Sequence, residues 1–258
     1  MYKTIDSESE AMLLLEVTST ACQLMLKNGA EVYRVEDTGE RIIRSKTNIK
    51  DVEVYATFNV VMISFNFNKH IFTSMKKIKT RTNNLMVVDA VNTFSREYVL
   101  GKTSLSDALD ELYEIKKGMG YKEFTGILGG AAASSLYCAL FLGDIYEMIA
   151  AFFVAFISQY LTSRLAKRKL SFFVDNFFSG FCISCFAILI VKMNSKIDID
   201  KVIIGSIMPF VPGLAMTNAV RDLMSGDSTT GITGAMNAII IATALACGVA
   251  FPLSLYLV

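Results

Sequence analysis

Residues 205–213 read Gly-Ser-Ile-Met-Pro-Phe-Val-Pro-Gly, an apolar stretch that two prolines and a glycine interrupt. Each proline removes a backbone donor, and glycine permits backbone angles that other residues avoid. Five apolar segments follow residue 118, at about 124–142, 146–163, 172–191, 202–220 and 230–257. The quoted stretch is part of the fourth segment. A membrane-spanning helix needs roughly 17–25 residues, so each segment is near or within that range. The sequence therefore predicts five transmembrane helices, the fourth of them broken.

Charged side chains are concentrated before these segments, because 32 of the 49 lie in residues 1–118. Helical patterns in this part of the chain surround β-prone runs at 52–56, 60–65 and 70–74. The predicted fold class is an α+β cytosolic N-terminal domain over residues 1–118, followed by an all-α five-helix transmembrane bundle over residues 119–258.

The distribution of basic residues predicts an orientation. The loop at 163–171 carries Arg164, Lys167, Arg168 and Lys169, and basic loops stay on the cytoplasmic side. The chain starts without the basic n-region of a signal peptide, so we expect a cytosolic N-terminus. Five crossings then place the C-terminus outside.

Several classes of protein are disfavoured. The net charge is +1 and no nucleic-acid motif is present, so we expect no nucleic-acid partner. His70 is the only histidine, which excludes multi-histidine metal sites. The Cys182-Ile-Ser-Cys185 spacing lies in an apolar helix without a nearby cation, and we interpret it as helix packing. No metal or cofactor is expected.

Polar residues follow the break in the fourth span. Asn218, Arg221 and Asp222 lie three and four residues apart, so they share one face of a helix. A guanidinium can bind a substrate carboxylate, and an aspartate can attract an ammonium group or carry a proton. A helix-terminating ion pair beside a packing kink is the alternative. The predicted substrate-binding residues are Pro209, Pro212, Gly213, Thr217, Asn218, Arg221 and Asp222.

Two further places are candidates. Asp175, near the start of the third span, could carry a proton, as could Asp222, or it could be solvated at the membrane interface. The stretch from Gly29 to Arg41 gathers carboxylates and guanidiniums, which could do acid–base work or form a solvated helix face.

Two motifs together resemble the threonine/serine exporter family over essentially the whole chain. The first is Gly29-Ala-Glu-Val-Tyr-Arg-Val-Glu-Asp37, which is similar to the start of that family's cytosolic domain. The second is Pro209-Phe-Val-Pro-Gly213 with Thr217-Asn218, Arg221-Asp222 and Gly226-Asp227. The matching cytosolic positions are Glu31, Tyr33, Arg34, Glu36 and Asp37. Gly39 stands where the family has a branched apolar residue, and we expect it to break the helix.

The resemblance also implies a function and a partner. A chain ending after five spans resembles the large subunit of the two-component form, which needs a small subunit of four or five spans. It implies proton-coupled export of threonine and serine, or of a dicarboxylate such as succinate, across a bacterial inner membrane. Several copies could assemble. The alternatives are a channel gated by the cytosolic domain, a membrane-tethered enzyme with its chemistry in that domain, and a non-catalytic regulator of another transporter.

Overall fold

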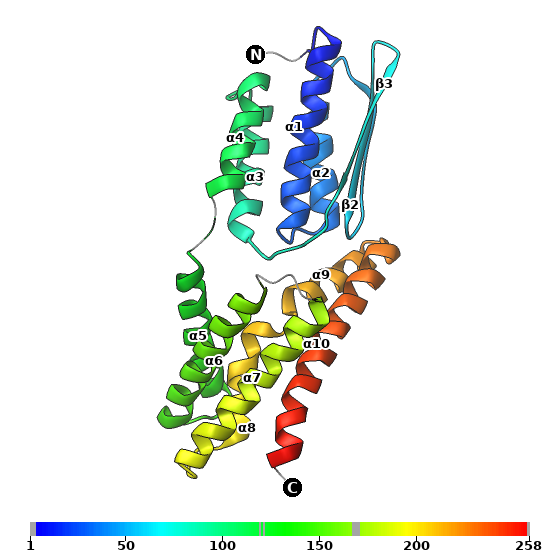
Figure 1. The fold of residues 1–258 in the computed structure, drawn as a ribbon. Helices are drawn as coiled ribbons and strands as arrows, with labels where there is room; N and C mark the ends of the chain where they lie inside the picture. The colour runs from blue at the N-terminus through cyan, green and yellow to red at the C-terminus, as the bar shows by residue number, and fades with distance from the viewer. Residues whose placement is uncertain (1–3, 119, 121, 167–170, 257–258) are drawn as a thin grey trace. The chain divides into compact units, whose positions relative to one another are not determined.

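The computed structural model describes residues 4–118, 120, 122–166 and 171–256 (Figure 1). The basic residues Lys167, Arg168 and Lys169 lie outside these ranges, as does part of the expected hinge at 118–123. The chain forms two compact units. The first contains Met1–Gly120 and Leu214–Ala235, and the second contains Tyr121–Gly213 and Met236–Val258.

The first unit is built from helices and one small sheet. Its elements are α1 (Glu8–Lys27), α2 (Val32–Arg44), β1 (Lys50–Ala56), β2 (Val60–Phe67), β3 (His70–Lys77), α3 (Leu85–Val99), α4 (Leu105–Gly118), α9 (Gly213–Met224) and the start of α10 (Ser228–Tyr256). The strands pair antiparallel in the order β1-β2-β3. Helix α1 contacts β2 and β3, α2 contacts β1, and α3 and α4 pack against α1 (Figure 1).

Alternation along the strands explains why only one face of the sheet is covered. In β1, Val52, Val54 and Ala56 are buried while Tyr55 between them is 54% exposed. Period-two alternation of this kind is the pattern of a strand that buries one face. The covered face joins the core formed by α1 and α2.

Helix α2 runs without interruption from Val32 to Arg44, so the expectation that Gly39 breaks it is wrong. A Cβ atom at Gly39 would lie 2.8 Å from Cys22 Sγ and 3.0 Å from Val54 Cγ1. The glycine therefore lets α2 approach both α1 and β1, and this packing outweighs its low helix propensity.

The second unit is helical throughout its described part. It contains α5 (Glu123–Leu140), α6 (Ile145–Ala166), α7 (Phe172–Met193), α8 (Ile199–Ile207), the 3₁₀ turn η1 (Met208–Phe210) and the remainder of α10. Side chains of α6, α7 and α8 form its core, with Val154, Ile183 and Val202 fully buried.

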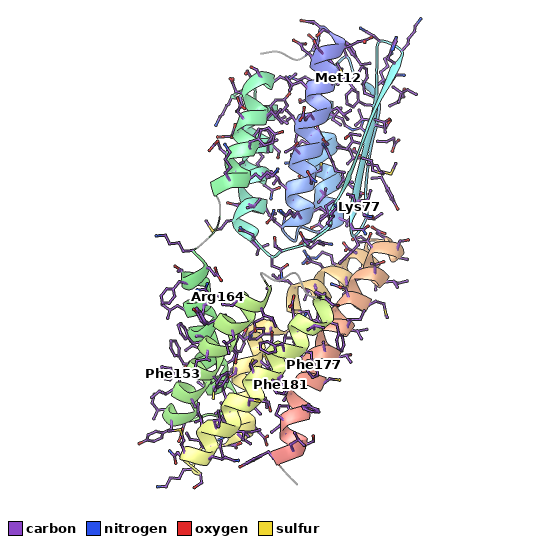
Figure 2. All side chains as sticks on the ribbon, in the orientation of Figure 1. Met12, Lys77, Phe153, Arg164, Phe177 and Phe181 are labelled. Atoms are coloured by element: carbon purple, nitrogen blue, oxygen red, sulfur yellow. The ribbon has the colours of Figure 1, made fainter. Side chains whose placement is uncertain are left out.

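Helices α7 and α10 approach each other through glycines. A Cβ at Gly180 would lie 2.4 Å from Leu245 O, and one at Gly248 would lie 2.1 Å from Phe177 O. Small residues of this kind allow the backbones of packed helices to touch. Phe181, labelled with Phe177 in Figure 2, completes the contact by packing its ring 6.2 Å from that of Phe251.

Glu147, at the start of α6, joins two loops of the second unit. Its carboxylate accepts hydrogen bonds from the backbone N–H groups of Asp144 (2.8 Å) and Asp198 (3.0 Å). It also pairs with Lys201 at 3.4 Å, and the residue is only 4% exposed. A buried carboxylate with two backbone donors and a cation is fully satisfied, which makes it a structural tie.

The predicted fold class is wrong in its membrane part. Among the residues that the structure describes, only α6, α7 and α10 are single helices long and apolar enough to cross a membrane, or four spans if the bent pair Ile199–Phe210 and Gly213–Met224 counts as one. Helix α5, which is 18 residues long and has Glu123 in its first turn, is not among them. The fourth predicted span is split between α8 and α9, and α9 belongs to the mainly helical first unit. An α+β domain followed by a bundle of five transmembrane helices is therefore not the observed architecture.

Replacing Gly39 by valine should lower the free energy of unfolding by about 1–3 kcal/mol, since the added atoms overlap Cys22 and Val54. The thermal stability of the detergent-solubilised chain measures this. Gly126→Ala is the control, because a Cβ at Gly126 meets nothing within 4 Å. Equal stability of Gly39→Val and wild type would contradict the packing role.

Replacing Glu147 by glutamine should destabilise the second unit by about 1–3 kcal/mol, because Lys201 loses the nearer of its two anionic partners and one backbone donor is left more weakly bonded. Asp200→Asn removes an exposed carboxylate from the neighbouring α8 and serves as the control. The same thermal measurement applies. A Glu147→Gln protein as stable as the Asp200→Asn protein would contradict a stabilising role for the contacts of Glu147.

Candidate functional site

The two sequence motifs meet in the first unit, where one face of α9 contacts the start of α2. Asn218 Nδ2 donates to Gly29 O at 3.0 Å, and the Arg221 guanidinium pairs with the Glu31 carboxylate. The Asp222 carboxylate lies beside the backbone N–H of Val32. We call this set the signature cluster; its members are Gly29, Glu31, Val32, Asn218, Arg221 and Asp222.

Gly29 occupies a position where both the backbone angle and the surrounding atoms favour glycine. Its φ is +94°, in the left-handed region that favours glycine. A Cβ here would also lie 3.0 Å from Asn83 Oδ1 and 3.3 Å from Thr82 O. The glycine ends α1, turns the chain into α2 and leaves its carbonyl oxygen available to Asn218.

Asp222 places a negative charge at the start of α2. Glu31 occupies the N-cap position but makes no side-chain cap hydrogen bond, and the first turn of α2 contains no acidic residue. The positive end of a helix favours a nearby carboxylate. Asp222, 6% exposed on another helix, lies beside the backbone N–H of Val32 in this turn. A carboxylate in such a position contributes about 0.3–1 kcal/mol.

Arg81 is a neighbour of the cluster that the sequence analysis missed. Its guanidinium donates to Phe58 O at 3.2 Å and Ala30 O at 3.3 Å, and it lies 4.6 Å from the centre of the Phe58 ring. Burial lowers its pKa, while the nearby Asp222 raises it. Arg81 is the only charged residue in the segment Thr80-Arg-Thr-Asn-Asn84, and that isolation was the available signal.

Glu36 adds a half-buried carboxylate on α2. It accepts a hydrogen bond from the Ala56 backbone N–H at 2.9 Å. Burial raises its pKa, the Ala56 hydrogen bond lowers it, and the negative charges of Asp227, Glu40 and Asp222 raise it further. This side of the site therefore favours a proton or a cation.

The remaining candidates near the start of α2 have different surroundings. Arg34 shares the Glu31 carboxylate with Arg221, at 3.3 Å. Asp37 forms an exposed ion pair with Arg41 at 2.6 Å, and Tyr33 is 45% exposed. These residues give α2 a charged surface.

The other candidates lie at the break and in the second unit. Pro209 is in η1, Pro212 and Gly213 follow it, and the Thr217 hydroxyl donates to Leu214 O at 3.1 Å. Asp175 is in α7, where its Oδ1 is buried without a hydrogen-bond partner among the described residues. Within the described ranges no group of three or more His, Cys, Asp and Glu side chains could hold a metal ion.

The pKa of Glu36 predicts a pH dependence of stability. A carboxyl whose pKa is raised by folding stabilises the folded state when protonated, and this contribution is lost as pH rises through the folded pKa. The wild-type chain should therefore lose thermal stability between the ordinary glutamate pKa and neutrality, and Glu36→Gln should lose less. Asp37→Asn, on the exposed face of α2, is the control. Identical pH profiles for Glu36→Gln and wild type would contradict this assignment.

Comparison with known proteins places the chain among transporters. Residues 16–256 match the family described as "Putative threonine/serine exporter". A Klebsiella aerogenes protein named "Probable succinate transporter subunit YjjP" is 21% identical over 252 residues, covering 96% of each chain. The Escherichia coli K12 protein of the same name is 22% identical over 235 residues, covering 90% of each. No solved structure matches the chain. With several helices able to cross a membrane, this chain is a multi-pass membrane protein and belongs to the threonine/serine exporter family.

Proposed function

We propose that the chain is the large subunit of a secondary active exporter of small carboxylate-bearing metabolites: threonine and serine, or a dicarboxylate such as succinate. The family and the names of the two relatives support export and these substrate classes. The observation that carries the proposal is the convergence of Asn218, Arg221 and Asp222 on the start of α2.

Arg221 is the proposed ligand of the substrate carboxylate. Its side chain is 55% exposed although it pairs with Glu31, so part of the guanidinium is accessible. A guanidinium presents several donors in a geometry that matches a carboxylate. Asn218 adds an amide, and Asp222 and Glu36 offer negative charge to an ammonium group. The chain that leads to Asn218 and Arg221 contains the break between α8 and α9. The proposed residues of this break are Pro209, Pro212, Gly213 and Thr217.

Proton coupling is proposed at Asp175 or Asp222. Asp175 lies in one of the apolar helices with a buried, unpartnered carboxylate oxygen in the described part of the chain. A carboxyl group in an apolar helix is a candidate proton carrier. Asp222 lies beside the proposed substrate ligand Arg221, which would link proton and substrate.

We further propose that the subunit works with a small membrane subunit of four or five spans in the bacterial plasma membrane. The relatives are themselves named as transporter subunits. The basic residues from Arg164 to Lys169 support a cytoplasmic position for the N-terminal domain over residues 1–118. The position of the C-terminus and assembly of several copies remain predictions.

Counterflow tests the proposal. Proteoliposomes containing this chain and its small subunit should exchange labelled threonine, serine or succinate. Arg221→Gln should raise the KM about tenfold or more, because a charge-assisted hydrogen bond contributes about 1.5–3 kcal/mol. Arg96→Gln removes an exposed cation from α3 and should leave the KM unchanged.

Absence of counterflow for all three compounds, in a complex shown to be assembled, would overturn the proposed function. Single-channel currents in planar bilayers would instead indicate a channel.

A further inference from the structure

The Glu31 carboxylate lies between two guanidiniums from different helices. Its Oε1 pairs with Arg221 of α9, and its Oε2 pairs with Arg34 of α2 at 3.3 Å. The Glu31 side chain is 12% exposed, whereas those of Arg34 and Arg221 are 39% and 55% exposed. The carboxylate is therefore enclosed while both cations remain accessible.

This arrangement gives Arg221 the same ligand that the proposed substrates would offer. Threonine, serine and succinate all carry a carboxylate, and a guanidinium binds a protein carboxylate and a substrate carboxylate with the same donors. The Arg221 N–H that donates to Glu31 is not available to a substrate, so a substrate carboxylate that takes this N–H must displace Glu31. Protein and substrate carboxylates therefore compete for it.

We infer that Glu31 is an internal competitor of the transported carboxylate, an inference that rests on the proposed function. When substrate binds, its carboxylate replaces that of Glu31 on Arg221, and Glu31 keeps Arg34 as its partner. Because Arg34 belongs to the same helix and lies three residues away, the displaced Glu31 is not left as an unpaired charge. The exchange is therefore inexpensive.

The exchange also changes how α9 is held. Asn218, Arg221 and Asp222 each contact a different residue between Gly29 and Val32. Substrate binding removes the Arg221 contact and leaves those of Asn218 and Asp222. Occupation of the site thereby loosens α9 from the start of α2, which couples substrate binding to the cytosolic signature.

The size of the effect follows from the exposure of the pair. A partly exposed ion pair is weak, so Glu31 occupies Arg221 for at most about four-fifths of the time. Removing the competitor should lower the apparent KM about three- to fivefold.

The test uses the assembled complex of the full chain and its small subunit, with succinate as the probe in counterflow. Glu31→Gln should lower the KM about three- to fivefold. Glu40→Gln removes a carboxylate from the same helix, where it pairs with Arg44 at 3.0 Å, and should leave the KM unchanged. In the Arg221→Gln background, Glu31→Gln should give no gain, because the contested ligand is absent.

The outcomes separate this inference from the proposed function. If wild type transports succinate or threonine but Glu31→Gln has an unchanged or raised KM, the competition is refuted and the transport function stands. If Glu40→Gln lowers the KM as much as Glu31→Gln, the change in KM comes from the loss of negative charge on α2, and the competition is refuted. If wild type transports none of the proposed substrates, the function itself fails.

A shorter carboxylate guards against a Glu31→Gln protein that does not assemble. Glu31→Asp keeps the charge but withdraws it by one methylene, so it should weaken the pairing and lower the KM by less than Glu31→Gln. An unchanged or raised KM for Glu31→Asp also counts against the competition.

Discussion

The uncapped start of α2 is the constraint on which the candidate site depends. The N-cap residue of α2 forms no cap hydrogen bond, and α9 places the Asp222 carboxylate beside the first backbone N–H of this helix. Asn218 and Arg221 are brought to Gly29 and Glu31 by the same contact, because the three residues share one face of α9. The start of α2 thus contacts residues of α9 that lie about 190 positions further along the sequence.

The packing around this contact explains why glycines and a buried arginine stand near the candidate site. Gly29 makes the turn that exposes its carbonyl oxygen, and Gly39 lets α2 lie close to α1 and β1. Arg81 ties the carbonyl oxygens of Ala30 and Phe58 together beside Asp222. Each of them fixes the position of the start of α2, so each acts on the site through geometry.

Sequence patterns predicted the local elements and the motifs better than the architecture. The β-prone runs at 52–56, 60–65 and 70–74 correspond to β1, β2 and β3, because the preference of residues for a strand is a local signal. The face shared by Asn218, Arg221 and Asp222 also follows from helical spacing alone. The pairing of Arg221 with Glu31 could not be predicted, since nothing local to either residue specifies a partner so distant in the sequence. The prediction of a five-span bundle was wrong, because the length of an apolar segment does not reveal that α8 and α9 belong to different compact units.

The glycine contact between α7 and α10 has a consequence for how this region can evolve. The atoms that a side chain at Gly180 or Gly248 would meet first are the backbone oxygens of Leu245 and Phe177. Every amino acid carries that oxygen, so no replacement at the opposing position can make room. A substitution at either glycine therefore cannot be rescued by a second change at the residue it touches. Lineages that retain this helix pair must keep both positions free of side chains, whatever solute the protein carries.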